Sequence, residues 1–260
     1  MTPKDADPVG VKIEWPSPPS SLSIQPGSIH VWAWDCDCSG DDLRQYVALL
    51  SAEECLRMQR FRFERDRTRF AVSHGVLRIL LGQYVGQHPK SISFDQNEFG
   101  KPHLAASAAA SEINFNLSHT SSVALLAIAA GLRVGVDVEE VRPIEPGLVE
   151  RYFSAQEQAS LKALDGSAWL EGFYNCWTRK EAILKGEGSG LQVRLDAFDV
   201  SLNPREQASV LGVRPDAGFT SSWNLIELQP AHGFIGTLAS DAPPPKVNCY
   251  RFESQTFDPI

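Results

Sequence analysis

Three acidic side chains, two of them on one short segment, have the chemistry and the spacing that a hard cation requires. In the segment RVGVDVEE, strand periodicity places the valines on one face and Asp137 and Glu139 on the other, roughly 7 Å apart along the strand. One divalent cation can bridge such a pair with help from a third carboxylate, for which Glu181 is a candidate. The alternative interpretation is a half-buried strand with a solvated polar face.

Two lysines lie close to Glu181 in the segment FYNCWTRKEAILKGEGSG, residues 173–190. The segment lacks proline and predicts a helix, on which Glu181 and Lys185 lie four residues apart on one face as a favourable pair. Lys180 lies about 100° around such a helix from Glu181 and is therefore left free for another partner. The alternative for Glu181 and Lys185 is a surface ion pair of small energetic value.

Acids and lysines together suit a metal-bound diphosphate better than either charge alone. Mg²⁺ prefers carboxylate and phosphate oxygens, and a lysine ammonium group binds phosphate as a point charge. In such a site the cation offsets charge on the phosphates, and a nearby carboxylate can accept a proton from an attacking hydroxyl group. The segments around Asp137 and Glu181 therefore favour magnesium and diphosphate chemistry.

The first half of the chain supplies basic and polar candidates for an anion site. The segment RMQRFRFERDRTR (57–69) carries six arginines against two acids, a local charge of +4. The segment NLSHT ends a predicted strand with Ser118 and His119, whose side chains can donate hydrogen bonds to phosphate oxygens. The alternatives are a solvated helix face or a nucleic-acid patch for the arginines, and a structural histidine for His119.

The composition limits the class of protein. The 260 residues, 43% hydrophobic and 22% charged, suffice for one large domain or for two halves. A formal net charge of -8 gives no general attraction to nucleic acid or to an anionic membrane. Five scattered cysteines without paired spacing indicate reduced thiols and hence a cytoplasmic protein. The longest apolar run, residues 123–132, is about half of a membrane span.

Two stretches with the same order of elements position these candidates. Residues 1–28 form a proline-rich leader, residues 29–132 an N-terminal α/β half, and residues 133–260 a C-terminal α/β half. The expected fold class is α/β (α+β), with two similar halves packed together. Two predicted helices begin at the capping boxes SAEE (51–54) and SAQE (154–157). Two more helices are predicted at residues 65–86 and in the segment around Trp177. The predicted strands lie at 29–34, 91–95, 113–119, 121–130, 133–141, 197–201, 222–228 and 233–239.

Four segments, in order, resemble the motifs of the Sfp-type 4′-phosphopantetheinyl transferases. That family has a G-[VI]-D-x-E strand and, about 40 residues later, W-x-x-K-E-x-x-x-K on a helix. Here Asp137 and Arg179 are 42 positions apart, and the resemblance extends from about residue 43 to residue 240. The four segments are FGKP (99–102), NLSHT (116–120), VGVDVE (134–139) and WTRKEAILKGEGSGL (177–191).

The resemblance implies two pseudo-symmetric α/β halves with coenzyme A bound in the cleft between them. It also implies the reaction: a serine hydroxyl of an apo carrier protein attacks the β-phosphate of coenzyme A, takes the 4′-phosphopantetheine arm and releases adenosine 3′,5′-bisphosphate. The acceptors are acyl or peptidyl carrier proteins of fatty-acid, polyketide or nonribosomal peptide synthesis. Mg²⁺ is the implied cofactor, and a monomer is expected because the trimeric branch of the family has chains of about half this length.

The family's residue roles can be assigned to the positions of this sequence that match its motifs. The resemblance implies that Asp137, Glu139 and Glu181 bind magnesium. Asp137, Glu181 and Lys185 are the implied catalytic residues, with Glu181 as the base toward the serine and Lys185 protonating or screening the leaving group. The implied contacts to coenzyme A are Arg57, Arg69, Lys101, Ser118, His119, Lys180 and Lys185. One position departs from the pattern, because Glu54 stands where several relatives carry a lysine.

Two other functions are compatible with parts of the sequence. A non-catalytic module that holds coenzyme A or a carrier protein has no use for a metal-bound base, so the acids and Lys185 count against it. Nucleic-acid binding through residues 57–69 conflicts with the net charge of -8. We therefore expect carrier proteins and coenzyme A as partners, with neither nucleic acid nor membrane.

Overall fold

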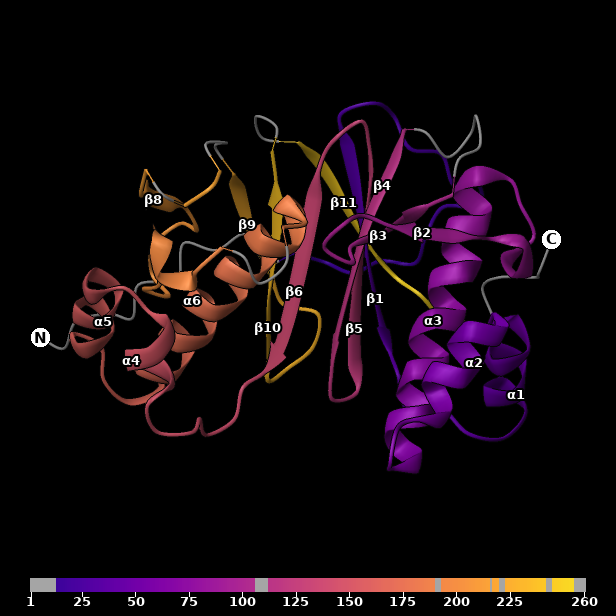
Figure 1. The fold of residues 1–260 in the computed structure, drawn as a ribbon, viewed down its shortest axis with the longest axis horizontal. Coiled ribbons are helices and arrows are strands. Elements are labelled where there is room, and N and C mark those ends of the chain that lie inside the picture. The colour runs from indigo at the N-terminus through magenta and orange to yellow at the C-terminus, as the bar shows by residue number, and fades with distance from the viewer. Residues whose placement is uncertain are drawn as a thin grey trace, which may run out of the picture.

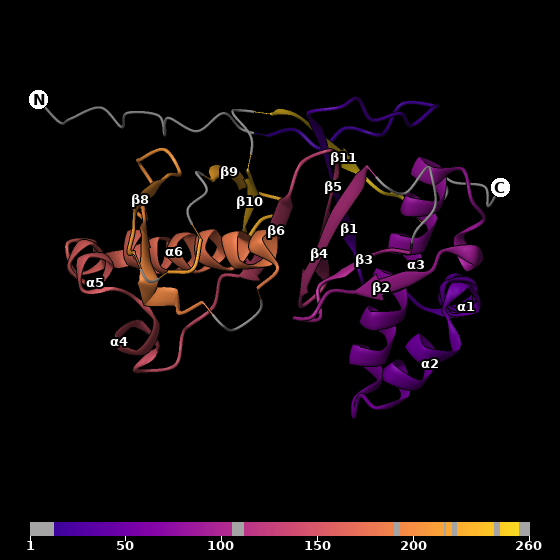
Figure 2. The same ribbon diagram turned by 45° about the horizontal axis from the view of Figure 1, so that its top comes forward.

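The protein has a mixed α+β fold of two halves that meet along their strands (Figure 1). Helices α1 to α3 lie beside one set of strands and α4 to α6 beside the other, and the view in Figure 2 keeps the same arrangement. The expected fold class is thereby confirmed. The computed structural model describes residues 13–105, 112–189, 193–215, 217–219, 223–241 and 245–254.

The N-terminal half runs from one strand through its helices to a short hairpin and then to two long antiparallel strands. In its sheet the central strands pair in the order β1-β5-β4, all antiparallel. The helices are α1 (Gly40–Leu49), α2 (Ala52–Gln59) and α3 (Glu64–Val85). The strands are β1 (Ser28–Asp35), β2 (Phe94–Gln96), β3 (Pro102–Leu104), β4 (Ile113–Thr120) and β5 (Val123–Ala130).

The C-terminal half repeats this order, element for element. Its sheet pairs as β6-β10-β9, which has the same antiparallel topology as β1-β5-β4. The pseudo-symmetry that no residue-level repeat reveals is therefore present in the strand order. The helices are α4 (Leu148–Tyr152), α5 (Ala155–Lys162) and α6 (Gly166–Glu187). The strands are β6 (Val134–Glu140), β7 (Phe198–Val200), β8 (Val210–Val213), β9 (Asn224–Leu228) and β10 (Phe234–Ser240).

Two segments cross the expected boundaries between leader and halves. The residues of strand β11 (Lys246–Arg251) were assigned to the C-terminal half, but the strand pairs in parallel with β1 and so completes the N-terminal sheet. The described part of the leader also packs onto the fold: Trp15 Nε1 donates to the Gln229 carbonyl oxygen at 2.9 Å, and the Pro16 carbonyl oxygen accepts from the Arg251 amide at 2.9 Å. Residues 1–12 of the leader lie outside the described residues.

The strands β1 and β5 are covered on both faces, which explains their continuous apolar sequences. Alternate residues of β1 such as Trp32 pack against α3, in the same core cluster as Leu80. The residues between them, such as Val31, pack with Val136 of β6 in a second cluster between the two sheets. A third cluster fills the space between α6 and its own sheet. The order of layers is therefore helix, sheet, sheet, helix.

Helix α6 lies unusually close to β6 because a glycine faces it. A Cβ atom added at Gly135 would lie 1.9 Å from the Ala182 carbonyl oxygen and 2.4 Å from the Gly186 nitrogen. Only glycine allows this approach. The strand residues Asp137 and Glu139, which share the face of Gly135, are thereby brought next to the helix.

Both predicted capping boxes are confirmed, since Ser51 with Glu54 and Ser154 with Glu157 exchange their reciprocal hydrogen bonds. Among the described α-helices and strands, the sequence did not predict α1, α4, β3, β8 and β11. All five cysteines are free. Among the helices described, none combines the length and the apolar character needed to cross a membrane.

Candidate active site

A row of hydroxyl groups and carboxylates follows the seam where β4 of the N-terminal half lies beside β6 of the C-terminal half. Each hydroxyl group near the end of β4 donates to a carboxylate of β6. Because the two strands come from different halves, this row fixes one half against the other at the level of the predicted acids. The pairs are Ser118 Oγ with Asp137 Oδ1 at 3.0 Å, Thr120 Oγ1 with Glu139 Oε2 at 3.2 Å, and Ser121 Oγ with Glu140 Oε2 at 2.5 Å.

Lys185 of α6 reaches this row. Its ammonium nitrogen lies 2.6 Å from Asp137 Oδ1 and 2.9 Å from Ser118 Oγ. Glu181, which the helix spacing predicted as its partner, forms no ion pair with it, so that prediction is wrong. The reason is the short distance between α6 and β6, which offers Lys185 a buried carboxylate on the neighbouring strand.

The charge of Asp137 acts on both other predicted metal ligands, Glu139 and Glu181. Burial, and then the Asp137 charge, raise the pKa of both Glu139 and Glu181, with Lys185 opposing the shift in each case. One carboxylate oxygen, Asp137 Oδ2, is buried without a hydrogen-bond partner. Such an excess of buried negative charge favours a bound cation.

The donor set fits Mg²⁺ in chemistry, because carboxylate oxygens are the ligands that this ion prefers. The described side chains are not, however, arranged as a metal centre. Within the described ranges, no three His, Cys, Asp or Glu side chains are grouped so as to hold an ion. Lys185 is in contact with the Oδ1 atom of Asp137 and so provides the positive charge beside this carboxylate.

Basic groups from α2, α3 and α6 surround the end of β4. Burial, and then the neighbouring basic side chains of His74, Lys185, Arg57 and Arg69, lower the pKa of His119 to about 4. The neutral imidazole can therefore act as a hydrogen-bond donor or acceptor within a positive surrounding. The arrangement is suited to an anion that contacts His119 and the groups around it.

Two arginines from the predicted anion site are held in different ways. Arg69 donates to Asp37, with Nε 2.8 Å from Oδ1, and is mostly covered. Arg57 is exposed, and its guanidinium group lies over the ring of Phe70. Glu54 is held by groups of α3. It accepts hydrogen bonds from His74 and Arg78 between α2 and α3.

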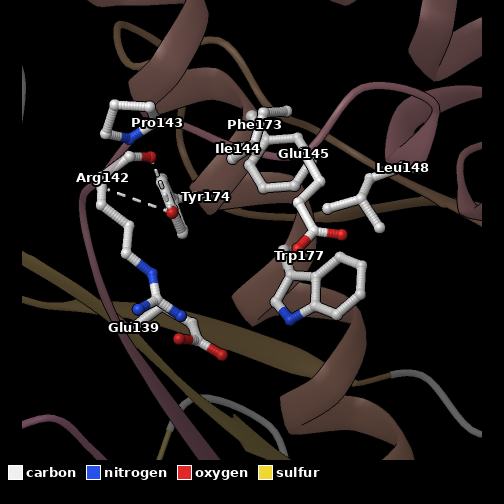
Figure 3. Close-up of a pocket in the computed structure, with 9 residues that line it drawn as sticks. All are labelled: Glu139, Arg142, Pro143, Ile144, Glu145, Leu148, Phe173, Tyr174 and Trp177. Atoms are coloured by element: carbon white, nitrogen blue, oxygen red, sulfur yellow. Dashed lines mark hydrogen bonds between the residues drawn. The ribbon is translucent and has the colours of Figure 1, made fainter.

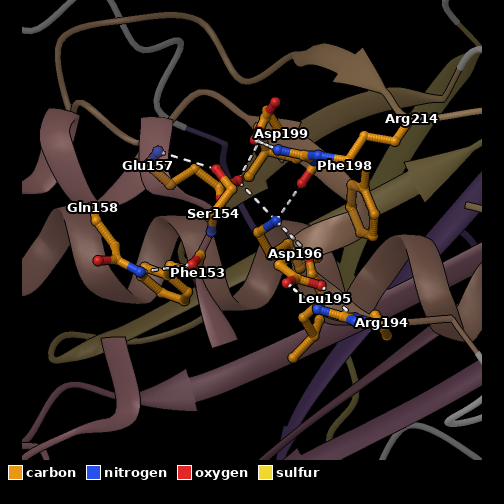
Figure 4. Close-up of polar contacts among 12 residues, drawn as sticks. Phe153, Ser154, Glu157, Gln158, Arg194, Leu195, Asp196, Phe198, Asp199 and Arg214 are labelled. Carbon is orange, nitrogen blue, oxygen red and sulfur yellow. Dashed lines mark hydrogen bonds and ion pairs between the residues drawn. The ribbon is translucent and has the colours of Figure 1, made fainter. Parts of the chain in front are cut away.

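Lys180 does not face the predicted phosphates, and this expectation is wrong. Its side chain is fully buried, with Nζ 2.8 Å from Glu157 Oε1 and hydrogen-bonded to the carbonyl oxygens of Leu195 and Phe198 at 2.6 and 2.5 Å. Figure 4 shows Glu157, Leu195 and Phe198 turned toward one common point. These three acceptors match the three protons of an ammonium group. Lys180 therefore ties α6 to α5 and β7 within the C-terminal half.

Lys101 also points into the protein. Its ammonium nitrogen donates to the carbonyl oxygens of Val134 and Gly186, at 3.2 and 2.9 Å. Burial, and then the charge of Arg133, lower the pKa of Lys101 to about 8. The expectation that this lysine contacts the nucleotide is therefore not matched by the direction of its side chain.

A pocket of about 470 Å³ opens beside Glu139, between α6 and the segment that follows β6 (Figure 3). Its base is apolar and includes the rings of Phe173 and Trp177, stacked with 6.0 Å between their centroids. Both belong to the helix row that continues to Glu181 and Lys185. The lining residues are Glu139, Arg142, Pro143, Ile144, Glu145, Leu148, Phe173, Tyr174 and Trp177.

Sequence reasoning missed several polar residues of the seam. Asn116 is buried and its Oδ1 accepts from the Val136 amide at 2.8 Å, which joins β4 to β6. Thr120, Ser121 and Glu140 complete the row of hydroxyl and carboxylate groups. The signal that could have revealed them is the run of polar residues at the ends of two predicted strands, 113–119 and 133–141. The sequence does not show, however, that these two strands lie side by side in the fold.

Two family models match the chain in succession. The first, described as 4′-phosphopantetheinyl transferase, N-terminal, matches residues 33–131, and the second, the 4′-phosphopantetheinyl transferase superfamily, matches residues 133–239. The change from one to the other coincides with the turn between the two halves.

Two similar proteins are themselves named 4′-phosphopantetheinyl transferases. The 4′-phosphopantetheinyl transferase HetI of Nostoc sp. is 34% identical over 227 residues, which cover 86% of this chain and 92% of that protein. The 4′-phosphopantetheinyl transferase Sfp of Bacillus subtilis is 28% identical over 176 residues, covering 68% and 77%. Among solved structures, Thermotoga maritima holo-[acyl-carrier-protein] synthase aligns with 42% of this chain and 62% of that chain, at a TM-score of 0.36 and 22% identity.

Proposed function

Because the chain belongs to the 4′-phosphopantetheinyl transferase superfamily, we propose that it transfers the 4′-phosphopantetheine arm of coenzyme A to a serine of an apo carrier protein. The observation that carries the proposal is the meeting of Lys185, Ser118 and Asp137 at the seam between the halves. A cation, a hydroxyl group and a buried carboxylate with a free oxygen are the groups that a diphosphate and its counter-ion require.

The phosphates of coenzyme A bind at the end of β4 in this proposal. His119 donates a hydrogen bond to them, Ser118 lies beside them with its hydroxyl proton donated to Asp137, and Lys185 supplies a positive charge beside the diphosphate. The arginines Arg57 and Arg69 contribute to the positive field around His119, which suits the 3′-phosphate. Lys101 and Lys180 are left out, because both are committed to contacts inside the protein.

Glu181 accepts the proton of the attacking serine. It lies one helical turn from Lys185, on the same face of α6. The serine oxygen forms a bond to the β-phosphorus, and the bond from that phosphorus to the oxygen bridging to the α-phosphate breaks. The electron pair leaves with adenosine 3′,5′-bisphosphate, whose new charge Lys185 screens or neutralises with a proton.

Asp137, Glu139 and Glu181 would hold Mg²⁺, for which the unpartnered Asp137 Oδ2 provides an available ligand atom. A bound Mg²⁺ would offset the charge that develops on the diphosphate. The protein groups meanwhile keep the carboxylates close, since Thr120 fixes Glu139 and Ser118 fixes Asp137.

The pocket beside Glu139 receives the pantetheine arm. It is lined by apolar rings, with Arg142 and Glu145 available for the amide groups of the arm. It lies next to Glu139, one of the proposed metal ligands. One chain supplies both sides of the seam, so we propose that the protein acts as a monomer. We also propose a cytoplasmic location, because coenzyme A is its proposed substrate.

The test is incubation with coenzyme A, Mg²⁺ and apo carrier proteins of the fatty-acid, polyketide and peptide types. Mass spectrometry should detect the added phosphopantetheine group on at least one carrier, and a carrier with its serine changed to alanine should gain none. Binding of coenzyme A without any transfer, across all three types, would instead indicate a non-catalytic module.

A further inference from the structure

The short hairpin of the N-terminal half reaches across to the last turn of α6 in the C-terminal half. In the turn between β2 and β3, Asn97 Nδ2 donates to the Gly188 carbonyl oxygen at 2.9 Å. Lys101 Nζ donates to the Gly186 carbonyl oxygen at 2.9 Å and to that of Val134, at the start of β6, at 3.2 Å. We call Asn97 and Lys101 together the hairpin clasp.

The turn itself is prepared for this contact. Asn97 Oδ1 accepts hydrogen bonds from the amides of Phe99 and Lys101, at 3.0 and 2.8 Å. The side-chain amide of Asn97 is thereby fixed with its Nδ2 toward the helix. The same residue thus shapes the turn and binds α6.

The clasp fills a chemical need at the helix end. The last carbonyl groups of an α-helix have no partner within the helix and carry partial negative charge, which an ammonium group stabilises. Gly188, the residue that ends α6, has φ +70, and a Cβ atom there would lie 2.7 Å from Lys101 Cδ. A glycine at this position therefore both ends the helix and leaves room for the lysine.

The two elements that the clasp joins are those that carry the candidate active site. Gly186 directly follows Lys185 on α6, and Val134 precedes Asp137 by three residues on β6. The contact between Lys185 and Asp137 depends on how close these two elements lie. A lysine that binds both of them therefore helps to set that distance.

Charged groups on the neighbouring elements surround the clasp without replacing it. Arg133 pairs with Glu187 and with Asp241, at 2.8 Å in each case. Arg133 disfavours the charged form of Lys101, whereas Glu187 and Asp241 favour it. The contacts of the Lys101 ammonium group with the two carbonyl oxygens are therefore an additional tie, made from the other half of the molecule.

We propose that Asn97 and Lys101 are positioning residues of the transferase, which hold the last turn of α6 and the start of β6 so that Lys185 meets Asp137. This inference rests on the proposed function. It assigns Lys101 to the geometry of the site and gives it no contact with the nucleotide.

The test compares Lys101→Met and Asn97→Ala with the wild type and with Lys90→Met, which changes an exposed lysine of the same half. We expect Lys101→Met to lower kcat about 10-fold while the KM for coenzyme A changes less than about 2-fold, because a small displacement of catalytic groups is costly. Asn97→Ala should act in the same direction, and Lys90→Met should match the wild type. A raised KM with unchanged kcat would make Lys101 a nucleotide ligand and overturn the proposal, as would unchanged values of both.

Hydrogen exchange supplies a readout that does not need transfer. In Lys101→Met, amides in the last turn of α6 should exchange about 10-fold faster than in the wild type, while those near Trp177 should not change. Equal exchange in the last turn would contradict the clasp. If Lys101→Met does not fold, the kinetic constants and the hydrogen exchange of Asn97→Ala test the proposal in its place. Transfer by the wild type tests the proposed function separately, so its failure cannot be mistaken for failure of the clasp.

Discussion

Lys185 Nζ lies 2.6 Å from Asp137 Oδ1, and this contact joins the long helix of the C-terminal half to the strand at the seam. The Asp137 side chain is 5% exposed and the Lys185 side chain 30% exposed, so the carboxylate is covered while the lysine side chain is partly exposed to solvent. A substrate phosphate can therefore reach the lysine without displacing the carboxylate. This contact therefore places the positive charge of Lys185 beside the acidic side chains.

Replacement of Lys185 should damage turnover more than binding. Lys185→Met removes the charge that screens the leaving group, so kcat should fall about 10²-fold or more. The buried Asp137 also loses its partner, and the free energy of unfolding should fall. Steady-state kinetics and chemical denaturation measure the two effects. Retention of full kcat in a folded variant would show that Lys185 has no part in the reaction.

Lys180 should matter for stability and not for recognition of coenzyme A. Lys180→Met leaves Glu157 as a buried, unpaired charge, which should lower the free energy of unfolding by about 3–5 kcal/mol. The double variant Lys180→Met, Glu157→Gln should recover part of this loss, because the buried charge is gone. Denaturant titrations of the wild type, both single variants and the double variant provide the cycle. A large rise in the KM for coenzyme A with unchanged stability would contradict the structural role.

The pocket beside Glu139 predicts which part of the substrate Trp177 contacts. Trp177→Ala should raise the KM for coenzyme A about 10-fold, because the pantetheine arm loses an apolar surface. The affinity of Trp177→Ala for adenosine 3′,5′-bisphosphate, which lacks the arm, should stay within about 2-fold of the wild-type affinity. Calorimetric titrations with this nucleotide are the matched control. Equal weakening of both ligands would place Trp177 against the nucleotide.

The three carboxylates predict a requirement for a divalent cation. Removal of Mg²⁺ by a chelator should stop transfer, and its return should restore transfer. Glu139→Gln should raise the Mg²⁺ concentration for half-maximal rate about 10-fold, because one ligand loses its charge. Glu53→Gln, an exposed change in the other half, should leave it unchanged. Full activity in the chelator would contradict the metal assignment.

Glu54 predicts a loss of stability in acid. Burial alone would raise its pKa, but hydrogen bonds from His74, the Ser51 amide and Arg78 lower the pKa of Glu54 to about 2, below its ordinary 4.5. The unfolded state therefore binds more protons between these values, and the contribution of Glu54 is lost as the pH falls from 4.5 toward 2. The stability advantage of the wild type over Glu54→Gln should shrink across this range. A constant difference in the free energy of unfolding would contradict the account.

Much of the fold was readable from local patterns. The capping boxes at Ser51 and Ser154 marked helix starts, and alternation in β6 placed Asp137 and Glu139 on one face. The strand β11 was missed because its pairing with β1 joins the two ends of the chain. Such a pairing depends on the whole fold and leaves no local signal.

The sequence placed Asp137 and Glu139 on one face of a strand, but it did not predict the directions of the lysine side chains. Helix geometry correctly separated Lys180 from Glu181, yet it does not tell whether the free side faces solvent or a buried carboxylate such as Glu157. The same limit applies to Lys101, whose acceptors are backbone carbonyl groups of the other half. Backbone acceptors carry no residue type, so the sequence gives no sign of them.

The central claim is that the acids at the seam carry out transfer to a carrier serine. The most direct measurement follows the mass of an apo carrier after incubation with coenzyme A and Mg²⁺, using the wild type and the double variant Asp137→Ala, Glu181→Ala. The account predicts complete conversion by the wild type and none by the double variant, with circular dichroism of the two proteins alike. Conversion by the folded double variant would contradict it.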